Sequence, residues 1–375
     1  MKKGKRILFR IISLFLVLSV IGGCAQKLNN DTKKTEETAN KIESENKNNT
    51  AKKDLSKELK TVNMGYNPNT GNILGFIAID SGIAEEEGID LELISFTNST
   101  DALNALQAKK IDVGVSFGTI APLTFVSQGA DFSIFGGYVS GGMPVYAKPD
   151  IEYKGMETFL GKKIAVARMY TPDVVWRGAM YRAGYDPEKD CEIIEFKKPT
   201  DVLAAVTSGK ADIGIGTNST YLQAVEAGLK ILTWTNDLDP MHVCCRPVAN
   251  NSWLNEDKDR AKNLLRAWIR AEDILLKDPE YCVKLNEKYM GLTEEESRKM
   301  LLETNQVFES DPKTKGIEYM WDMMGKLNYA DTSGVDLSKH MNKELYKEAL
   351  DELIKEYPDN ENFKKFEERF KEYND

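Results

Sequence analysis

Histidine is nearly absent from this sequence, since His242 and His340 are the only two in 375 residues. This leaves few candidates for histidine-based acid–base catalysis. The Walker-type phosphate loop is absent, which argues against ATP hydrolysis by this chain. We therefore expect a protein that is not an enzyme and that needs no cofactor.

Basic clusters are also missing beyond the first ten residues, and the net charge is −9. This charge distribution argues against a nucleic-acid partner. The hydrophobic fraction of 41% and the charged fraction of 29% are typical of a globular protein. Apart from the N-terminal run described next, no segment has the length and apolarity that a membrane-spanning helix needs.

The N-terminus has the layout of a secretory signal, with basic residues first, an apolar run at 11–21 and then Gly22, Gly23 and Cys24. The apolar run is shorter than the roughly 20 residues of a transmembrane helix. Ile21–Cys24 resembles a bacterial lipobox. That resemblance implies a lipoprotein signal peptide at residues 1–23 and a lipid on Cys24, which would anchor the protein outside the cell membrane. The alternative is a membrane anchor that is never cleaved.

Residues 24–57 are rich in Lys, Glu, Asn and Thr and contain almost no large apolar side chains. Such a composition predicts a disordered tether. The remaining cysteines do not have the spacing of a small disulfide scaffold, so we expect mostly buried thiols; they are Cys191, Cys244, Cys245 and Cys282.

His242 stands close to Cys244 and Cys245, which raises a metal hypothesis. However, neighbouring side chains in an extended strand point to opposite faces, and no second ligand pair has zinc spacing. We therefore predict buried thiols and no metal site, although His242 remains free to face a cleft.

An internal repeat defines the architecture: TDALNALQAKKIDVGV at 100–115 and TDVLAAVTSGKADIGI at 200–215 match at an offset of 100 residues. A period of this length indicates two domain-sized copies of one unit rather than a solenoid. Each copy shows a strand, a helix, a strand, a second helix and a short strand. Thr100 and Thr200 are the predicted N-caps of the second helix.

The predicted elements follow the same order in both copies. We expect strands at 61–65, 91–95, 113–115, 163–167, 192–196 and 213–215, and helices at 73–86 and 173–183. Alternation of this kind predicts an α/β fold with a doubly wound, mostly parallel sheet in each lobe. The pattern is helical from about residue 255 to the end.

The predicted domains are lobe 1 at 58–145, lobe 2 at 146–238, a return crossover with helices packing on lobe 1 at 239–341, and charged C-terminal helices at 342–375. Ligands of doubly wound sheets bind at the carboxyl ends of the strands. Two facing lobes would therefore form a ligand cleft between them.

Three stretches, 75–96, 100–137 and 160–187, resemble solute-binding proteins of the nitrate, sulfonate and taurine importer class. The resemblance implies the type II periplasmic-binding-protein fold with two crossover strands. It also implies a small-molecule solute and, as a partner, a membrane ABC permease with its ATPase; we expect a monomer. Pro68-Asn69-Thr70 is similar to a stretch of thiamin-pyrimidine binders, but Gly71 and Asn72 stand where that group has an accompanying histidine.

The candidate ligand contacts lie in the loops after the predicted strands. In lobe 1 they are Tyr66, Asn67, Asn69, Thr70, Asn98, Ser116, Phe117, Gly118 and Thr119. In lobe 2 they are Arg168, Tyr170, Thr171 and Asn218. Arg168 either clamps an anion with its forked donors or is a solvated surface charge. The Asn, Gly and Thr residues have turn and capping roles as their alternative, with Thr171 as the expected cap before Pro172.

The sequence thus favours an extracytoplasmic solute-binding lipoprotein that captures a small polar, anionic organic solute and delivers it to a permease. A thiamin pyrimidine precursor is the alternative solute. Two further hypotheses are an exported enzyme using His242 with a cysteine, and a ligand-sensing partner of a membrane receptor.

Overall fold

The computed structural model describes residues 59–375, so the predictions made for residues 1–57, Cys24 included, lie outside the described residues. All the described residues belong to one compact unit. Within residues 59–375, no helix combines the length and the apolarity needed to cross a membrane.

Lobe 1 is built on a five-stranded sheet with the strand order β2-β1-β3-β11-β4. The strands are β1 (Lys60–Tyr66), β2 (Ile89–Ser95), β3 (Val113–Gly114), β4 (Phe132–Ile134) and β11 (Val248–Asn250). β1 pairs in parallel with β2 and β3, whereas β11 is antiparallel to both of its neighbours. β11 is therefore a strand that returns to lobe 1 from elsewhere in the chain.

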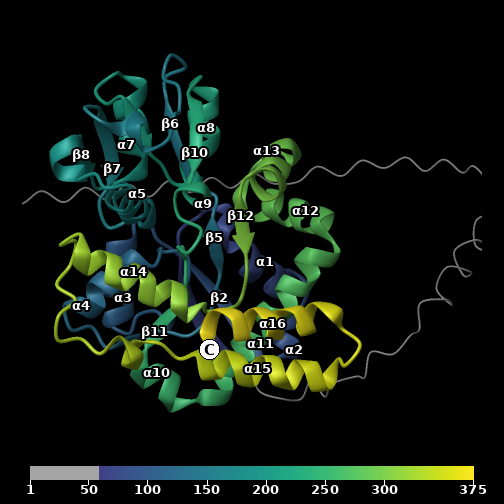
Figure 1. The fold of residues 1–375 in the computed structure, drawn as a ribbon. Helices are drawn as coiled ribbons and strands as arrows, with labels where there is room; N and C mark the ends of the chain where they lie inside the picture. The colour runs from purple at the N-terminus through teal and green to yellow at the C-terminus, as the bar shows by residue number, and fades with distance from the viewer. Residues whose placement is uncertain (1–58) are drawn as a thin grey trace, which may run out of the picture. The chain divides into compact units, whose positions relative to one another are not determined.

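Lobe 2 repeats this arrangement in a sheet of order β10-β6-β9-β7-β8. The strands are β6 (Pro144–Ala147), β7 (Lys163–Ala167), β8 (Glu192–Phe196), β9 (Ile213–Ile215) and β10 (Lys230–Trp234). β7 is parallel to β8 and β9, and β6 is the antiparallel strand. Figure 1 shows this sheet above that of lobe 1. The predicted fold class, two α/β lobes with two crossover strands, is confirmed.

The 100-residue repeat is visible in the register of the two sheets. Gly114 pairs with Gly65 in lobe 1, and Gly214 pairs with Ala165 in lobe 2. The repeated aspartate has the same task in both lobes: Asp112 accepts from the backbone N–H of Asn63 at 2.8 Å, and Asp212 accepts from that of Lys163 at 2.8 Å. Each carboxylate therefore ties the start of a short strand to its neighbour.

Helices cover both sheets, as parallel sheets require. In the first repeat they are α1 (Ile73–Asp80), α2 (Ile83–Glu86), α3 (Ser99–Gln107) and α4 (Ile120–Ser127), with the short 3-10 helix η1 (Thr70–Asn72). In the second they are α5 (Thr171–Arg182), α6 (Pro187–Asp190), α7 (Pro199–Thr207), α8 (Tyr221–Glu226) and α9 (Thr235–Leu238), with η2 (Met156–Phe159) and η3 (Asn218–Thr220).

Three local predictions were wrong. The helix expected at 73–86 is broken into α1 and α2 at Gly82, which has a positive φ of 76°. α3 is capped by Asn98, whose side chain accepts from the N–H of Asp101, so Thr100 lies inside the helix. α7 begins at Pro199, which likewise places Thr200 inside its helix.

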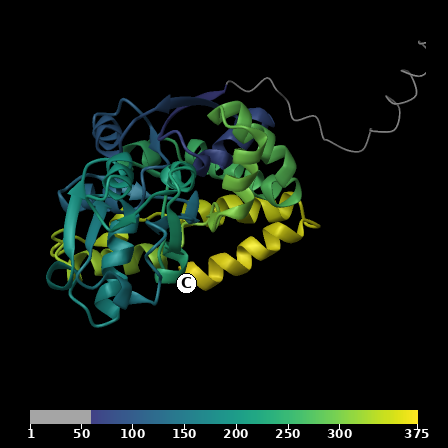
Figure 2. The same ribbon diagram turned by 90° about the horizontal axis from the view of Figure 1, so that it is seen from above.

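The C-terminal part is mostly helical and packs against the lobes. Its helices are α10 (Asn251–Glu256), α11 (Lys258–Lys277), α12 (Pro279–Met290), α13 (Glu294–Arg298), α14 (Thr314–Lys326), α15 (Lys343–Glu356) and α16 (Glu361–Asn374), with the short segments η4 (Lys299–Glu303) and η5 (Leu337–His340). Figure 2 shows α15 and α16, in yellow, side by side along the C-terminal end.

A short strand interrupts this helical region, contrary to the prediction of helix from residue 255 onward. β12 (Gln306–Phe308) pairs antiparallel with β5 (Val139–Gly141), which lies on the first passage of the chain from lobe 1 to lobe 2. Figure 1 shows both strands at the level between the two sheets. The C-terminal region therefore reaches the junction of the lobes.

Arg246, which is 1% exposed, holds together three segments of the chain. They are the two crossover segments between the lobes, 135–143 and 239–247, and the segment after β12. The Arg246 guanidinium donates to Glu309 Oε1 at 2.9 Å, to Ser140 Oγ at 3.0 Å and to the carbonyl of Pro312 at 2.9 Å. Lys313 Nζ approaches the other oxygen of Glu309 at 2.6 Å. Burial opposes ionisation of Glu309, but the surrounding cations Arg246, Lys313 and Arg369 outweigh it and lower its pKa to about 2.

We predict that Glu309→Gln lowers the free energy of unfolding by about 3 kcal/mol at neutral pH, because Arg246 would remain buried without its carboxylate. The native pKa of Glu309 lies below its unfolded value, so its contribution is present above the unfolded pKa and is lost as pH falls toward the native pKa. The stability difference between wild type and variant should therefore shrink from about pH 6 to about pH 3.

Urea unfolding at several pH values measures this difference, and Glu303→Gln, at an exposed position before β12, is the matched control. Equal free energies of unfolding for the Glu309 and Glu303 variants would show that the buried pair does not hold the crossovers.

Candidate functional site

The loops that follow the parallel strands of the two lobes meet one another. We call the interlobe region the loops after β1, β3, β7 and β9 together with β12 and the two crossover segments, 135–143 and 239–247. Such strand ends are where doubly wound sheets bind ligands. Of the sequence-predicted residues, all but Asn98, which follows β2, belong to or adjoin these loops. They do not all face the other lobe.

The closest approach joins the loop after β3 to the start of α5. Gly118 has a positive φ of 74°, and a Cβ atom there would lie 2.9 Å from Thr171 Oγ1. The backbone N–H of Thr119 donates to the same Thr171 oxygen at 3.1 Å. Only glycine fits both the left-handed backbone and the contact. Thr171 was predicted to be the helix cap, but the cap position is Tyr170, and the Thr171 hydroxyl contacts lobe 1 instead.

A second polar bridge spans the lobes through Gln306 of β12. Asn218 Nδ2 of lobe 2 donates to Gln306 Oε1 at 2.9 Å, and Thr70 Oγ1 of lobe 1 lies 3.3 Å from the same oxygen. All three residues are buried. Gln306 Nε2 also donates to the carbonyl of Met300 at 2.8 Å. Sequence analysis missed Gln306, because a three-residue strand has no periodicity to detect.

Other predicted contacts are bonded within lobe 1. Asn67 donates from its backbone N–H to Ser116 Oγ at 2.8 Å, and its side-chain Nδ2 donates to the Ser116 carbonyl at 3.3 Å. The Asn67 side-chain oxygen is buried with no hydrogen-bond partner among residues 59–375. Asn69 caps η1 by accepting from Gly71 N–H at 2.8 Å, which is turn chemistry.

The predicted aromatic contacts differ in their surroundings. Phe117 is 3% exposed and packs edge-on against Phe96 with ring centroids 6.1 Å apart, so it belongs to the core. Tyr170 and Tyr66 are half-buried. Burial raises the pKa of the Tyr170 hydroxyl.

Asn98 and Arg168 have their polar groups engaged elsewhere. The side chain of Asn98 caps α3. The guanidinium of Arg168 stacks 3.5 Å from the ring centroid of Tyr329 and lies 3.5 Å from Glu195 and 3.9 Å from Asp173. An anion could recruit Arg168 only by competing with these two carboxylates.

The thiols of the second crossover also face this region. Cys191, Cys244, Cys245 and Cys282 are all free, and all but the half-buried Cys191 are buried, as predicted. The prediction that neighbouring side chains would point apart was wrong, because the sulfurs of Cys244 and Cys245 are 3.6 Å apart. The hydrogen bond from the Cys244 thiol lowers the pKa of Cys245 against the effect of burial, and the same contact raises the pKa of Cys244.

His242 is buried and its ring Nδ1 pairs with the carbonyl of Asp239. A carbonyl oxygen only accepts, so Nδ1 carries the proton. Burial lowers the pKa of the imidazole, which keeps the ring neutral. No hydrogen bond between the His242 ring and a cysteine therefore supports the exported-enzyme hypothesis.

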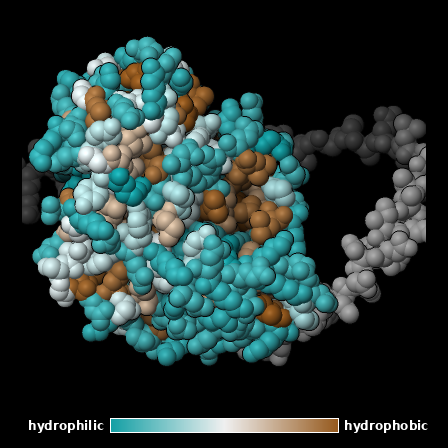
Figure 3. All heavy atoms as spheres, in the orientation of Figure 1, coloured by the Kyte–Doolittle hydropathy of each residue, from teal (hydrophilic) through white to brown (hydrophobic). Residues whose placement is uncertain are grey.

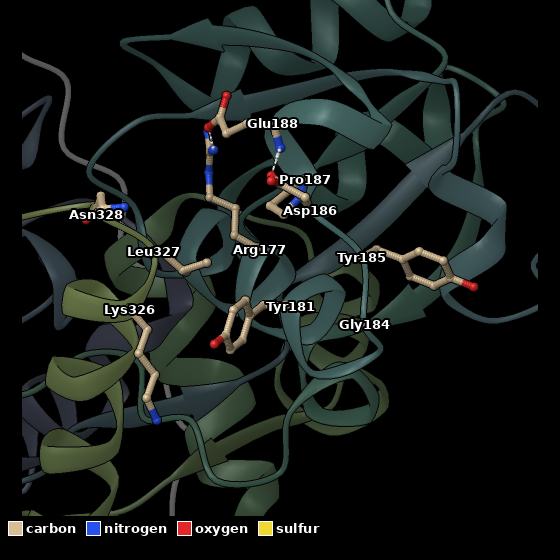
Figure 4. Close-up of a pocket in the computed structure, with 10 residues that line it drawn as sticks. All are labelled: Arg177, Tyr181, Gly184, Tyr185, Asp186, Pro187, Glu188, Lys326, Leu327 and Asn328. Carbon is tan, nitrogen blue, oxygen red and sulfur yellow. Dashed lines mark hydrogen bonds and ion pairs between the residues drawn. The ribbon is translucent and has the colours of Figure 1, made fainter.

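A hollow of about 610 Å³ lies between lobe 2 and the end of α14 (Figure 4). It is lined by the segment from Arg177 to Glu188 and by Lys326, Leu327 and Asn328. Arg177 is occupied there by ion pairs with Asp173, Glu188 and Glu195. The hollow includes none of the predicted ligand contacts.

The outer face of β12 is apolar. Val307 is 45% exposed and Leu302, just before the strand, is 43% exposed. Figure 3 shows apolar side chains gathered around β12 and α12. The polar Gln306 points inward from the same strand, so β12 separates a polar junction from an apolar surface.

The architecture defines the class of protein: two α/β lobes joined by antiparallel crossover strands, with strand-end loops facing each other, form the periplasmic-binding-protein fold. The model of the NMT1-like family matches residues 56–284. The chain belongs to the NMT1-like family.

Solved structures agree on the fold. The periplasmic aliphatic sulphonate-binding protein of Escherichia coli superposes with a TM-score of 0.63 at 18% identity, covering 77% of this chain and 99% of that chain. The periplasmic nitrate-binding protein of Synechocystis superposes with a TM-score of 0.65 at 15% identity, covering 79% of this chain and 89% of that chain.

Two sequence relatives are also named as binding proteins. A Brucella abortus protein, whose name assigns it only provisionally as a binding protein, is 26% identical over 229 residues, or 59% of this chain and 68% of the relative. The formylaminopyrimidine-binding protein of Halalkalibacterium halodurans is 21% identical over 311 residues, or 79% of this chain and 86% of the relative.

We predict that Gln306→Leu lowers the free energy of unfolding by about 2 kcal/mol, because the buried polar groups of Thr70 and Asn218 would lose their shared partner. Gln223→Leu, at an exposed position on α8, is the matched control and should change stability by no more than about 0.5 kcal/mol. Thermal unfolding checks both. A Gln306 variant as stable as the control would mean that the bridge contributes nothing to the contact between lobes.

Proposed function

We propose that this chain is the solute-binding component of an ABC importer and that it captures a small polar solute between its lobes. The supporting observation is that strand-end loops of both lobes meet through polar groups, at Thr119–Thr171 and at Thr70–Gln306–Asn218. Named neighbours of the same fold are periplasmic binding proteins for a sulfonate and for nitrate.

The proposal includes the cellular setting inferred from the N-terminus. A lipid on Cys24 would anchor the chain to the outer side of the cell membrane, and residues 24–57 would tether the binding unit. The solute would pass to a membrane permease driven by its ATPase, with this chain acting as a monomer.

The working cycle depends on the contacts between lobes. Separation of the lobes about the crossover segments would expose the strand ends. A solute would then replace direct contacts such as the hydrogen bond from Thr119 N–H to Thr171. A solute favours closure only if it binds the closed form more tightly than the open one, so its contacts must involve both lobes.

A small anion is the first candidate solute. Gly118 and Thr119 present backbone N–H groups at the start of α4, and helix starts favour negative charge. Thr171 at the start of α5 and the amide of Asn218 would add donors from lobe 2. Recruitment of Arg168 as an anion clamp remains part of this proposal, at the expense of its contacts with Glu195 and Asp173.

A pyrimidine precursor is the second candidate, favoured by the side-chain amides of Asn67, Asn218 and Gln306 at the interlobe region. An amide offers both donors and an acceptor, which suits a neutral heterocycle. Half-buried Tyr66 and Tyr170 would contact its ring. The Halalkalibacterium relative, whose alignment covers 79% of this chain, is named as a formylaminopyrimidine-binding protein.

We predict that one compound class raises the melting temperature in a panel of alkanesulfonates, taurine, nitrate, carboxylates and formylated aminopyrimidines. A solute at about 100 times its dissociation constant stabilises the folded state by about 2.7 kcal/mol. Asn218→Ala should weaken binding of that solute about tenfold, whereas Asn104→Ala, exposed on α3, should leave the dissociation constant unchanged. If the Asn218 and Asn104 variants bound the solute with equal affinity, the interlobe region would not be the binding site.

Arg168→Ala separates the two candidates. An anion that recruits the guanidinium should bind the variant about tenfold more weakly, because a charged hydrogen bond is lost. A neutral pyrimidine should bind wild type and variant alike. Isothermal titration with the compound found in the panel measures both dissociation constants.

A further inference from the structure

Three sulfur atoms form a cluster at the junction of the lobes. Cys244 Sγ lies 3.6 Å from Met143 Sδ and 3.6 Å from Cys245 Sγ. The three residues are 2% (Met143), 6% (Cys244) and 7% (Cys245) exposed. Both cysteines are free thiols, so the sulfurs are available for coordination.

The two crossover segments bring these sulfurs together. Met143 ends the first crossover, directly before β6. Cys245 lies on the second crossover and exchanges two backbone hydrogen bonds with Val139 of β5, at 2.8 and 3.3 Å. This pairing places residues about 100 apart in sequence side by side, and the two thiols lie on one side of it, with their sulfurs 3.6 Å apart.

Polar groups of both lobes surround the thiols. Thr119 of lobe 1 donates from its hydroxyl to the carbonyl of Cys244, and its backbone N–H donates to Thr171 Oγ1 of lobe 2. The cation of Arg246 is the next residue along the chain. The metal-bound form of a cysteine is the thiolate, and a coordinated cation itself stabilises that form.

We propose that Met143, Cys244 and Cys245 form a binding site for a soft monovalent metal ion, Cu(I). Thiolates with a thioether are the donor set that selects Cu(I), whereas hard cations prefer oxygen. Three metal–sulfur bonds of about 2.3 Å would place the sulfurs about 4 Å apart in a trigonal arrangement, close to the two separations found here.

The donor set also argues against a zinc site. Structural zinc takes four ligands from cysteine, histidine and carboxylate side chains. In residues 59–375, no group of three or more His, Cys, Asp and Glu side chains could hold a metal ion. The third donor is a thioether, a softer and uncharged ligand. On binding, each coordinating thiol gives up its proton to solvent, and no electron is transferred.

The site lies where the lobes contact each other, so separation of the lobes would admit the ion. A bound ion would join the first crossover to the second directly. This inference goes beyond the proposed capture of an organic solute and stands or falls independently of it.

The test is an anaerobic Cu(I) titration against a competing chelator. It uses the full chain in mild detergent, with Cys24→Ala in every sample so that only the cysteines of the described part remain. We expect one Cu(I) per chain. Cys244→Ser and Cys245→Ser should each weaken binding by about 100-fold, and the near-isosteric Met143→Leu by about tenfold.

Cys191→Ser is the matched control, because Cys191 is half-buried and donates to the carbonyl of Phe159 rather than to another sulfur. It should leave the Cu(I) affinity unchanged. X-ray absorption should count three sulfur ligands in the wild type and two in Met143→Leu, and thermal unfolding of each variant establishes that it is folded.

Wild-type affinity in folded Cys244→Ser or Cys245→Ser would overturn the site, as would a Cys191→Ser variant that loses affinity equally. Unchanged affinity and sulfur count in Met143→Leu would overturn the three-sulfur site. A solute found in the panel above has no bearing on these outcomes, so failure of one proposal is distinguishable from failure of the other.

Discussion

The buried cation of Arg246 is the interaction on which the junction of the two lobes depends. It sits on the second crossover and donates to Ser140 on the first and to Glu309 after β12. Arg369 of α16 extends this network through two hydrogen bonds to Glu272 of α11. Because a buried charge is costly without its partners, these segments are constrained to stay together. These segments position the loops of the interlobe region.

Pairing of charges within the protein also shapes the candidate site. Arg168, Arg177 and Arg246 each face carboxylates, and the groups that connect the lobes are hydroxyls, amides and backbone N–H groups. A solute entering such a region would be recognised by hydrogen bonds of neutral groups, and contacts from both lobes would have to compensate for the water that it loses. This places weakly hydrated anions and neutral heterocycles ahead of strongly hydrated ions.

The sulfur cluster depends on the same network around Arg246. Met143, Cys244 and Cys245 lie together because Val139 and Cys245 pair across the two crossovers, and Arg246 holds that pairing from one side. The walls that would close on a solute and the sulfurs that would bind a soft ion are therefore parts of one junction, and a change in either alters the surroundings of the other.

Local sequence patterns predicted much of the fold. The 100-residue repeat predicted both sheets, because alternating strands and amphipathic helices set burial over short distances, and the repeated aspartates occupy equivalent positions at Asp112 and Asp212. The cap predicted at Thr100 failed because Asn98, an equally good cap, comes two residues earlier. Such competition between neighbouring residues moves helix boundaries without changing the element.

The sequence by itself therefore determined the two lobes, their order of strands and helices, and the loops that meet between the lobes. Only the tertiary structure decided that Gln306 bridges Thr70 and Asn218, that Arg168 stacks on Tyr329, and that three sulfurs converge. The physical reason is that these partners lie about 90 to 240 residues apart, apart from the adjacent Cys244 and Cys245. Packing of whole lobes and crossovers brings them together, and no local periodicity encodes such a meeting.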